Sequence, residues 1–439
     1  MMFEEARHFL ARTGFEGTLD EILALAKVDR KTAVEQALAK TISSAGTPAP
    51  SWINSRPPHP RVRKAMSPEE KKAFKQERRT RGRELKSWWF QEMVVTPSPL
   101  TERMTLFWHN HFTSSLRKVK WPTLLYRQNV LFRRMAVGSF RDLLGAVAKD
   151  PAMILYLDTQ TNNKDRPNEN FARELFELFT LGEGHYSEQD IKEAARAFTG
   201  RKLNRRDGSF RIARRQHDNG TKTVLGKTGR LTGDDILAIA LDQPWTAVHL
   251  VKKLWREFIS DQPDPHEVER LARIFRKSDY QLKPVLTELF LSPNFWSQEN
   301  RGVLIKSPVE LMVGTIRLFD LPISDLRMLP RYSRRLGQDL FDPPNVKGWP
   351  GGTQWITTNT LLDRWQLLQR GLRGHEMGGH RHGMKPMMDS HEPTWIKGTT
   401  IRELQTVLLP LQPVQPVSEG EERWQAIRDL VLDPTYQLK

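Results

Sequence analysis

The sequence predicts a mainly α-helical fold: a multi-helical, bundle-like body that carries a small β-hairpin insert. The first observation is the helical spacing of apolar residues, which recurs from residue 97 onward in segments such as "SFRDLLGAVAK" and "HEVERLARIFRK". The second is a recurring helix start, in which Ser or Thr stands three residues before Glu. The third is one strand-like interruption, "KLNRRDGSFRIARR", where Asp207-Gly208 provides a hairpin turn.

Several segments follow one another along the chain. We expect N-terminal helices over residues 1–46, a Pro-rich exposed linker over 47–66, a long basic helix over 67–96, a helical core over 97–372 with its hairpin insert at 201–225, a His- and Gly-rich mobile loop over 373–393, and a C-terminal helical tail over 394–439. The long helix begins at a capping box of Ser67 and Glu70, with Pro68 in the first helical position. In the core, "FDPPNVKGWPGGTQWI" predicts an ordered loop that packs Trp349 and Trp355 onto the body.

Composition narrows the class of protein. The 439 residues are 38% hydrophobic and include 13 tryptophans, which is enough for one large core or two closely packed ones. The chain has no cysteine, so disulfides, thiolate metal sites and cysteine nucleophiles are all excluded. A net charge of +16 favours an acidic partner such as nucleic acid, an anionic polysaccharide or an acidic protein, although solubility alone also explains it.

The sequence gives no sign of membrane insertion. No apolar run is long enough to cross a bilayer, so we expect no transmembrane segment. The N-terminus "MMFEEARHFLARTGF" has acidic residues where a signal peptide needs a positive region followed by an apolar one. The chain as written is therefore expected in the cytoplasm, and an exported or envelope-associated protein is expected only if a leader has been removed.

The basic helix concentrates charge. From Lys71 to Lys86, "KKAFKQERRTRGRELK" holds eight cations against two glutamates. One interpretation is a surface for a polyanion. The other, which we favour, is a solvated helix face with ion pairs between residues four apart.

A polar stripe lies on the helix predicted for "NENFARELFELFTLG". At about 100° per residue, Asn170, Glu174 and Glu177 fall within a wedge of roughly 60°, with Arg173 at its edge and the phenylalanines and leucines on the other side. The wedge is typical of a cleft whose carboxylates act as metal ligands, as general acids and bases, or as hydrogen bonders to a sugar or phosphate. A solvated acidic stripe with surface ion pairs explains the same pattern.

Histidines provide the other candidates. In "FWHNHF", His109 and His111 point about 200° apart on a helix, so they share one metal only if the helix ends or unwinds there. His111 falls on the apolar face and is expected in the core, whereas His109 is expected to point outward. In "HDNG", His217 and Asp218 place an imidazole beside a carboxylate, or form a simple turn. His375, His380, His382 and His391 lack regular ligand spacing.

The motifs resemble those of a known family. "ARHFLARTGF", "RMTLFWHNHF", "PAMILYLD", "NENFARELFELFTLGEGHYSEQDIKEAARAFTG", "HDNGTKTVLG", "LVKKLWREFI" and "FDPPNVKGWPGG" occur in the order seen in the bacterial family called domain of unknown function 1800, from about residue 5 to residue 370. The residues that match the family pattern as they stand are Trp108, His109, Asn110, His111, Asn168, Glu169, Asn170, Arg173, Glu174, Glu177, Thr199, His217 and Asp218. This chain departs at Phe179, because "ELHTLG" with a histidine is typical of the family.

The resemblance implies motifs rather than a mechanism, because the family is uncharacterised. Its members often carry an export signal and are commonly encoded beside a sulfatase-like family, domain of unknown function 1501. This implies an envelope or extracellular role for many members, with a sulfatase-like protein as a candidate partner. The lack of a leader in this chain departs from that pattern.

One functional hypothesis is a metal-assisted hydrolase or a phosphoryl- or glycosyl-transfer enzyme, with its site where "WHNHF", "NENFARELFEL" and "HDNG" meet. Its catalytic residues would be Glu174, Glu177, His217 and His109. Substrate would be bound by Asn170, Arg173, Asn168 and Asn110. The cofactor would be a divalent metal held by ligands drawn from His111, His109, Glu174, Glu177 and Asp218. The sequence has no Gly-rich phosphate loop, HExxH, GxSxG or Rossmann fingerprint to support a more specific assignment.

The alternative is a non-catalytic binding or scaffold protein for an anionic polymer or an acidic protein. The basic helix from Lys71 to Lys86 would dock this partner together with Arg205, Arg206, Arg214 and Arg215. The motif residues would then only hold the helices together through buried hydrogen bonds. The sequence leaves both hypotheses open.

Overall fold

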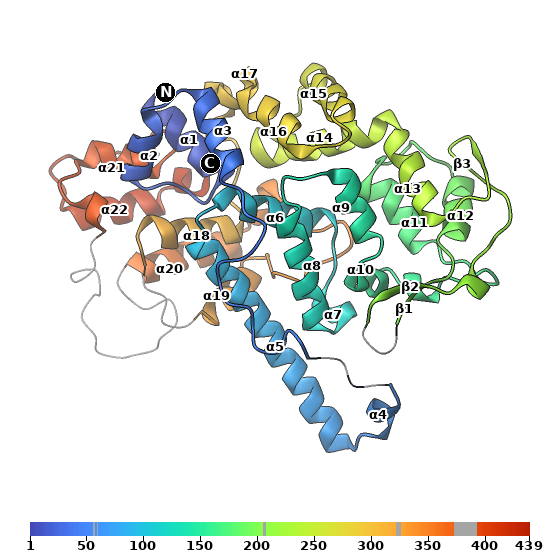
Figure 1. Ribbon diagram of the computed structural model, residues 1–439. Helices are drawn as coiled ribbons and strands as arrows, with labels where there is room; N and C mark the ends of the chain where they lie inside the picture. Colours follow the sequence, from blue (N-terminus) through green and yellow to red (C-terminus); the bar gives the residue numbers. More distant parts are fainter. Residues whose placement is uncertain (56–57, 59, 205–207, 322–325, 373–392) are drawn as a thin grey trace.

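α-Helices provide nearly all of the regular structure, which confirms the mainly α-helical class. The structure is a computed structural model, and it describes residues 1–55, 58, 60–204, 208–321, 326–372 and 393–439. Figure 1 shows an elongated body of packed helices, from which one long helix, α5 (Pro68–Val95), projects. Within the described ranges, the β-structure consists of two antiparallel sheets of two strands each.

The two ends of the chain pack together at one side of the body. Figure 1 shows α1 (Phe3–Thr13) and α2 (Leu19–Ala26) beside α21 (Ile401–Leu408) and α22 (Arg423–Leu432). These helices bury a common hydrophobic cluster that includes Ala6, Ile22, Leu404 and Ile427. The first and last helices of the chain thus stabilise each other.

The predicted long basic helix is confirmed as α5, which begins at the Ser67–Glu70 capping box. Its first half projects from the body in Figure 1. Its last turns enter the core, where Trp88, Trp89, Phe90 and Met93 are buried. One end of α5 is therefore fixed by hydrophobic packing while the basic end reaches into solvent.

The Pro-rich stretch before α5 is not exposed throughout. Thr47 and Trp52 are buried. The backbone N–H of Thr47 donates to Glu92 at 2.7 Å, and the indole of Trp52 donates to Glu84 at 2.6 Å. Part of this stretch is therefore held against α5 by carboxylates of that helix. A short helix, α4 (Pro60–Ala65), lies within the predicted 47–66 linker, shortly before α5.

The centre of the body is built around α6 (Pro99–His111), which is buried on nearly every side. Both side chains of the Glu102–Arg133 ion pair are 0% exposed, and Trp89 also donates to Glu102 at 2.8 Å. A buried carboxylate requires such partners because desolvation of an unpaired charge is costly. Helix α6 packs against α8 (Pro122–Arg134) and α1. The other helices of the first half of the chain are α3 (Arg30–Ala39), α7 (Leu116–Val119), α9 (Phe140–Val147), α10 (Pro151–Tyr156), α11 (Asn170–Glu174) and α12 (Glu188–Ala197).

The predicted hairpin insert is confirmed, and a second hairpin follows it. Strand β1 (Arg201–Leu203) pairs antiparallel with β2 (Phe210–Ile212), although residue 207 of the predicted turn lies outside the described residues. The second pair, β3 (Lys222–Val224) and β4 (Lys227–Gly229), was not predicted. Leu225 and Gly226 connect these strands with φ values of 48° and 79°, which suits a tight two-residue turn.

The rest of the body is also helical. Its helices are α13 (Gly233–Asp242), α14 (Pro244–Phe258), α15 (Pro265–Lys277), α16 (Leu282–Leu291), α17 (Pro293–Trp296), α18 (Pro308–Leu318), α19 (Met328–Arg335) and α20 (Thr358–Leu372). The histidines of the predicted His- and Gly-rich loop lie outside the described residues. Among the helices of the described ranges, none is long and apolar enough to span a membrane.

Candidate functional site

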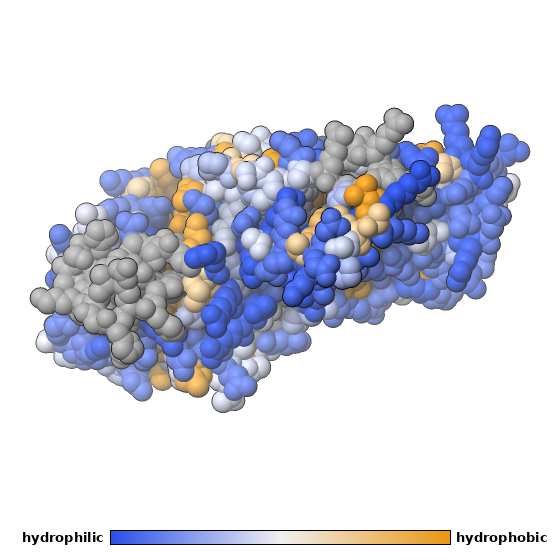
Figure 2. All heavy atoms as spheres, turned by 90° about the horizontal axis from the view of Figure 1, so that it is seen from below, coloured by the Kyte–Doolittle hydropathy of each residue, from blue (hydrophilic) through white to orange (hydrophobic). Residues whose placement is uncertain are grey.

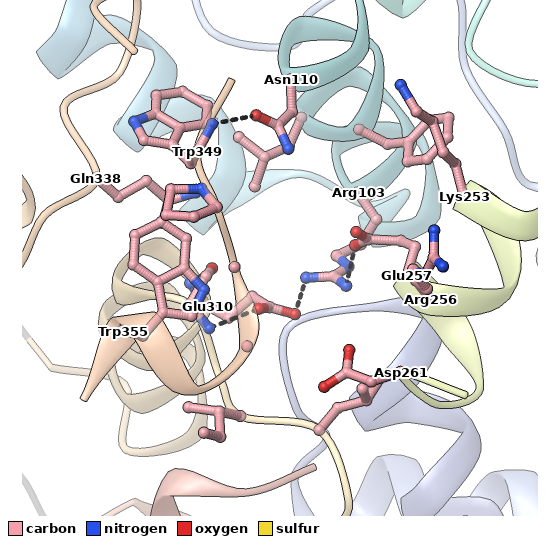
Figure 3. Close-up of a pocket in the computed structure, with 18 of the residues that line it drawn as sticks. Arg103, Asn110, Lys253, Arg256, Glu257, Asp261, Glu310, Gln338, Trp349 and Trp355 are labelled. Carbon is pink, nitrogen blue, oxygen red and sulfur yellow. Dashed lines mark hydrogen bonds and ion pairs between the residues drawn. The ribbon is translucent and has the colours of Figure 1, made fainter. Parts of the chain in front are cut away.

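A cavity of about 310 Å³ opens between α6, α14, the start of α18 and the chain that follows α19 (Figure 3). Its polar, charged and tryptophan lining residues are Arg103, Asn110, His111, Lys253, Arg256, Glu257, Asp261, Ser307, Glu310, Gln338, Lys347, Trp349, Trp355 and Lys439. Three of the sequence segments on which the resemblance rests therefore meet here, namely "RMTLFWHNHF", "LVKKLWREFI" and "FDPPNVKGWPGG". We call this space the central cavity.

One wall of the central cavity is the 341–352 loop, "FDPPNVKGWPGG", which is tied to the end of α6. The backbone N–H of Trp349 donates to the side-chain oxygen of Asn110 at 2.7 Å. Gly348 has a φ of +88°, and a Cβ there would lie 2.2 Å from the same oxygen, so only glycine fits. Asn110, a predicted substrate-binding residue, thus uses its oxygen to hold the loop, and its side-chain nitrogen lies on the cavity side in Figure 3.

The 341–352 loop and the turn that follows it pack Trp349 and Trp355 against the body, as predicted from the aromatic residues of this segment. Figure 3 shows both indoles on one side of the central cavity, opposite Lys253, Arg256 and Glu257 of α14. The indole nitrogen of Trp349 is buried without a hydrogen-bond partner. In Figure 3 this nitrogen lies at the edge of the ring that faces away from Lys253 and Arg256.

His109 was predicted to point outward, and this prediction is wrong. The side chain is 1% exposed, because α5, α8 and the 341–352 loop cover the face of α6 that carries it. Its Nε2 accepts the backbone N–H of Phe341 at 3.2 Å. Burial lowers the pKa of His109 to about 3, and nearby Lys86 acts in the same direction. His109 is therefore a neutral imidazole that holds the loop.

His111 is buried as expected, but it has a charged neighbour. Lys253 donates to its Nδ1 at 3.0 Å and to the backbone carbonyl of Leu178 at 3.0 Å. Burial lowers the pKa of Lys253 to about 8, with Arg256 acting in the same direction, and burial also holds the pKa of His111 well below its ordinary value. Lys253 can therefore exchange a proton near neutral pH, which suits a general acid or base.

A buried ion network forms the floor of the central cavity. Arg103 is 1% exposed and pairs with both Glu257 and Glu310. Lys439 also pairs with Glu310. Burial raises the pKa of Glu310, but the charges of Arg103 and Lys439 outweigh this effect and hold the pKa well below its usual range. Both glutamates are thus committed as counterions, and neither is placed as a general acid.

The predicted acidic wedge lies outside the central cavity and contacts the 341–352 loop through Lys347. Glu177 is 3.5 Å from the ammonium of Lys347 and 3.5 Å from the hydroxyl of Tyr186. Glu174 is half-buried, and burial together with the charge of Glu177 raises its pKa. After α11, residues Leu175–Phe179 form a π-helical turn, a local feature that is common at functional sites. Through Lys347, the wedge is connected to the central cavity but does not line it.

The other residues of the predicted polar helix have structural roles. Arg173 forms a surface network with Glu188 at 2.7 Å and Glu169 at 3.1 Å, which is the ion-paired stripe that was the alternative. Asn168 accepts the backbone N–H of Asn170 at 3.0 Å and so starts α11. Asn170 itself is exposed. None of the interactions of these residues reaches the central cavity.

The "HDNG" loop forms a separate polar cluster. Nδ1 of His217 lies 3.0 Å from the backbone carbonyl of Thr199, and Asp218 accepts from Arg196 at 2.8 Å. Asp218 also accepts the backbone N–H of Gly220 at 2.8 Å, as in a turn. The ring of His217 is therefore bound just after the C-terminal end of α12, and the carboxylate of Asp218 is bound to α12 itself. Of the three motifs that were predicted to meet, "WHNHF" and "NENFARELFEL" are joined through Lys253, which contacts His111 and Leu178, and "HDNG" lies apart from them.

The predicted metal ligands do not converge. His109 accepts a hydrogen bond from the backbone of Phe341, whereas His111 accepts one from Lys253. Glu177 contacts Lys347, and Asp218 pairs with Arg196. Across the described part of the chain, no group of three or more His, Asp or Glu residues is arranged to hold a metal ion. Arg205 and Arg206 of the alternative docking surface lie outside the described residues, and Arg214 and Arg215 lie in a short 3-10 turn.

The model of one protein family matches residues 8–438, which is nearly the whole chain. The chain belongs to the family described as protein of unknown function (DUF1800). No curated protein and no solved structure matches it. Membership confirms the resemblance seen in the motifs, but the family description states no reaction, ligand or partner. The role of this DUF1800 protein must therefore be inferred from its own site.

Sequence reasoning missed Lys253, Arg256, Trp349 and Trp355 as lining residues of a common site. The signal was present, because these residues lie in "LVKKLWREFI", "FDPPNVKGWPGG" and the segment that follows it. At the position where the resemblance to DUF1800 implies a histidine, this chain has Phe179, which is fully buried with its ring 5.9 Å from that of His111. An apolar ring thus replaces a second imidazole beside His111.

Proposed function

We propose that this DUF1800 protein binds an acidic saccharide in the central cavity. The observation that carries the proposal is the opposition of two walls: Trp349 and Trp355 lie on one side, and the cationic side chains of Lys253 and Arg256 on the other (Figure 3). A sugar ring has an apolar face of C–H groups that packs on an indole, and its carboxylate or sulfate pairs with a cation. The cavity offers both at once.

The charge of the lining supports an anionic ligand. Five cations, Arg103, Lys253, Arg256, Lys347 and Lys439, line the cavity with three carboxylates, Glu257, Asp261 and Glu310. Two of the carboxylates are already neutralised by Arg103 and Lys439. A concave site with an excess of positive charge attracts an anion more strongly than a flat surface does.

Hydrogen-bond donors support a polyhydroxylated ligand. The side-chain nitrogen of Asn110 lies on the cavity side, and the nitrogens of Lys253 and Arg256 line the same space. Sugar hydroxyls satisfy such donors, because each hydroxyl oxygen accepts hydrogen bonds. A small number of placed polar groups on a largely preformed cavity is the usual basis of ligand specificity.

The test is calorimetric titration with an oligosaccharide of galacturonate, beside the neutral oligosaccharide of galactose. We expect binding of the acidic ligand only, and a loss of about tenfold or more in affinity for Trp355→Ala and for Arg256→Gln. Trp245→Ala is the matched control, because Trp245 is 45% exposed and does not line the cavity. Equal binding by wild type, Trp355→Ala and Arg256→Gln, or no binding at all, would overturn the proposal.

A further inference from the structure

A second concave surface lies beside the projecting helix α5. It is a groove of about 520 Å³, and its charged lining residues are Lys75, Arg78, Arg79, Arg83, Lys86, Arg117, Lys120, Arg334, Asp339 and Asp342. Eight cations thus face two carboxylates. Figure 2, which looks onto the side from which α5 projects, shows a mostly hydrophilic surface there. We call this surface the cationic groove.

Helix α5 sorts its charges between the groove and its other faces. Lys75, Arg78, Arg79, Arg83 and Lys86 recur three or four residues apart and so form one stripe along about three turns. The glutamates of the same region turn elsewhere: Glu77 pairs with Arg81, and Glu84 accepts the indole of Trp52. The groove side of α5 therefore carries cations without the intrahelical carboxylates that neutralise a solvated basic helix.

The two carboxylates of the groove are already paired. Asp339 pairs with Lys86, and Asp342 pairs with Arg117 at 2.8 Å. The remaining six cations have no carboxylate partner among the described residues; these are Lys75, Arg78, Arg79, Arg83, Lys120 and Arg334. The Nε of Arg78 is moreover buried without a hydrogen-bond partner, with the guanidinium over the ring of Trp121. Unpaired like charges gathered in a concave surface repel one another until an anion binds between them.

The cationic groove leads toward the central cavity. A neighbouring hollow of about 410 Å³ shares Arg117, Arg334, Asp339 and Asp342 with the groove. The same hollow is lined by Trp349, which also lines the central cavity. Groove, hollow and cavity thus follow one another along the 341–352 loop, with Trp349 between the last two.

The lining of the groove distinguishes between classes of polyanion. Sites for single-stranded nucleic acid combine cations with aromatic side chains on which bases stack. The aromatic rings beside the groove, Phe74 and Trp121, lie under the guanidinium of Arg78, and no described residue of the lining itself is aromatic. Arginine guanidinium groups suit carboxylate and sulfate groups, which they bind through two parallel hydrogen bonds.

We propose that the cationic groove binds a stretch of an acidic polysaccharide chain, one end of which reaches the central cavity past Trp349. The inference rests on the proposed function for the saccharide class of the ligand, while the binding of a polyanion rests on the groove alone. The polymer supplies a row of negative charges for the six unpaired cations. The central cavity then holds one terminal or branching sugar of the same chain.

The test measures affinity for galacturonate oligomers of increasing length and for heparin fragments, at about 50 mM and about 200 mM salt. We expect affinity to rise with length and to fall with salt. The groove variant Arg78→Gln/Arg79→Gln/Arg83→Gln should bind long oligomers about tenfold or more weakly, with a shallower salt dependence. The control Lys71→Gln/Lys72→Gln/Arg81→Gln removes the same charge from the same helix outside the groove and should retain most of the affinity. Circular dichroism should show both variants folded, because all six residues precede the turns of α5 around Trp88, Trp89, Phe90 and Met93 that fix the helix in the core.

The two proposals fail separately. If Trp355→Ala weakens the binding of only the shortest oligomers, while the groove variant weakens the binding of only the long ones, both proposals are supported. Long oligomers that bind the wild type and depend on the groove, without any binding of short ones, would overturn the cavity proposal alone. Equal losses in the groove variant and its control would overturn the groove. Tighter groove-dependent binding of an oligothymidylate or polyglutamate of equal charge would replace the polysaccharide by another class of partner.

Discussion

The central cavity and the "HDNG" loop both gather polar residues from motifs of the DUF1800 family, yet they differ in what those residues have left to bind. In the "HDNG" loop, Asp218 is used by Arg196 and by the backbone of Gly220, and His217 is used by Thr199. In the cavity, the side-chain nitrogen of Asn110 lies on the cavity side, and the nitrogens of Lys253 and Arg256 line the same space. The comparison teaches that polar residues of two family motifs differ in whether they face a cavity.

Acid should act first on the region around the central cavity, where His109 lies on α6 and His249 lies on α14, with its Nε2 3.0 Å from the backbone carbonyl of Leu178. His109 and His249 both have pKa values lowered from 6.5 to about 3, mainly by burial, so the folded protein keeps both imidazoles neutral. The unfolded chain binds a proton at each near pH 6.5, so stability is lost as pH falls from 6.5 toward 3, by about 1.4 kcal/mol per pH unit for each histidine. Urea denaturation at several pH values should show this dependence of the free energy of unfolding on pH. In His109→Gln the slope should be smaller by the contribution of one histidine, about 1.4 kcal/mol per pH unit. An unchanged slope in His109→Gln would contradict the lowered pKa.

Removal of Arg103 should be the most damaging single change on the cavity floor. Arg103→Met removes the shared counterion of the buried Glu310 and the partly exposed Glu257, and Lys439 still pairs with Glu310. The free energy of unfolding should fall by about 3 kcal/mol. The matched change near the "HDNG" loop is Arg196→Met, which breaks the partly exposed pair with Asp218. That variant should lose about 1 kcal/mol or less. Denaturant midpoints of the two variants measure the difference, and equal losses would erase the distinction between the two regions.

The attachment of the 341–352 loop is tested by two glycines. Gly348 and Gly351 both have positive φ, but only Gly348 lies against Asn110, whereas a Cβ at Gly351 meets nothing within 4 Å. Gly351→Ala should cost about 1 kcal/mol from backbone strain alone. Gly348→Ala should cost more and should also weaken saccharide binding, because it displaces Trp349. Thermal unfolding and calorimetric titration of the pair check this, and identical behaviour of both variants would count against the tight contact.

The smallest effect is expected from the imidazole of the "HDNG" loop. His217→Gln keeps a polar group beside Thr199 and should change saccharide affinity by less than about twofold, because surface polar changes rarely exceed 0.5 kcal/mol. The same titration as for Trp355→Ala measures it. A large loss of binding in a folded His217→Gln variant would move the "HDNG" loop back into the functional site.

Local signals in the sequence predicted the elements well. Ser67, Glu70 and Pro68 specify the start of α5 by hydrogen bonds within one helical turn, so no distant contact was needed. The Asp-Gly turn likewise predicted the β1–β2 pair. The β3–β4 hairpin was missed because Leu225-Gly226 carries a weaker turn signal than Asn-Gly or Asp-Gly.

The site was predicted only in part, because it depends on distant packing. Periodicity placed His109 outward, but coverage of α6 by three other segments cannot be read from one helix. Asn110 and His111 do line the cavity, and Glu177 reaches it only through Lys347. Lys253, which has the pKa of about 8 beside His111, appeared in the sequence as one of many cations. Its distinguishing feature is burial, which composition does not record.

The most direct test of the central claim is fluorine NMR of the protein labelled with 5-fluorotryptophan, titrated with a galacturonate oligosaccharide. Trp349→Phe, Trp355→Phe and Trp245→Phe assign the three relevant signals. We predict that the signals of Trp349 and Trp355 shift in a saturable manner, while that of the exposed Trp245 stays in place. Signals of Trp349 and Trp355 that remain unchanged at saturating ligand would contradict the binding of an acidic saccharide in the central cavity.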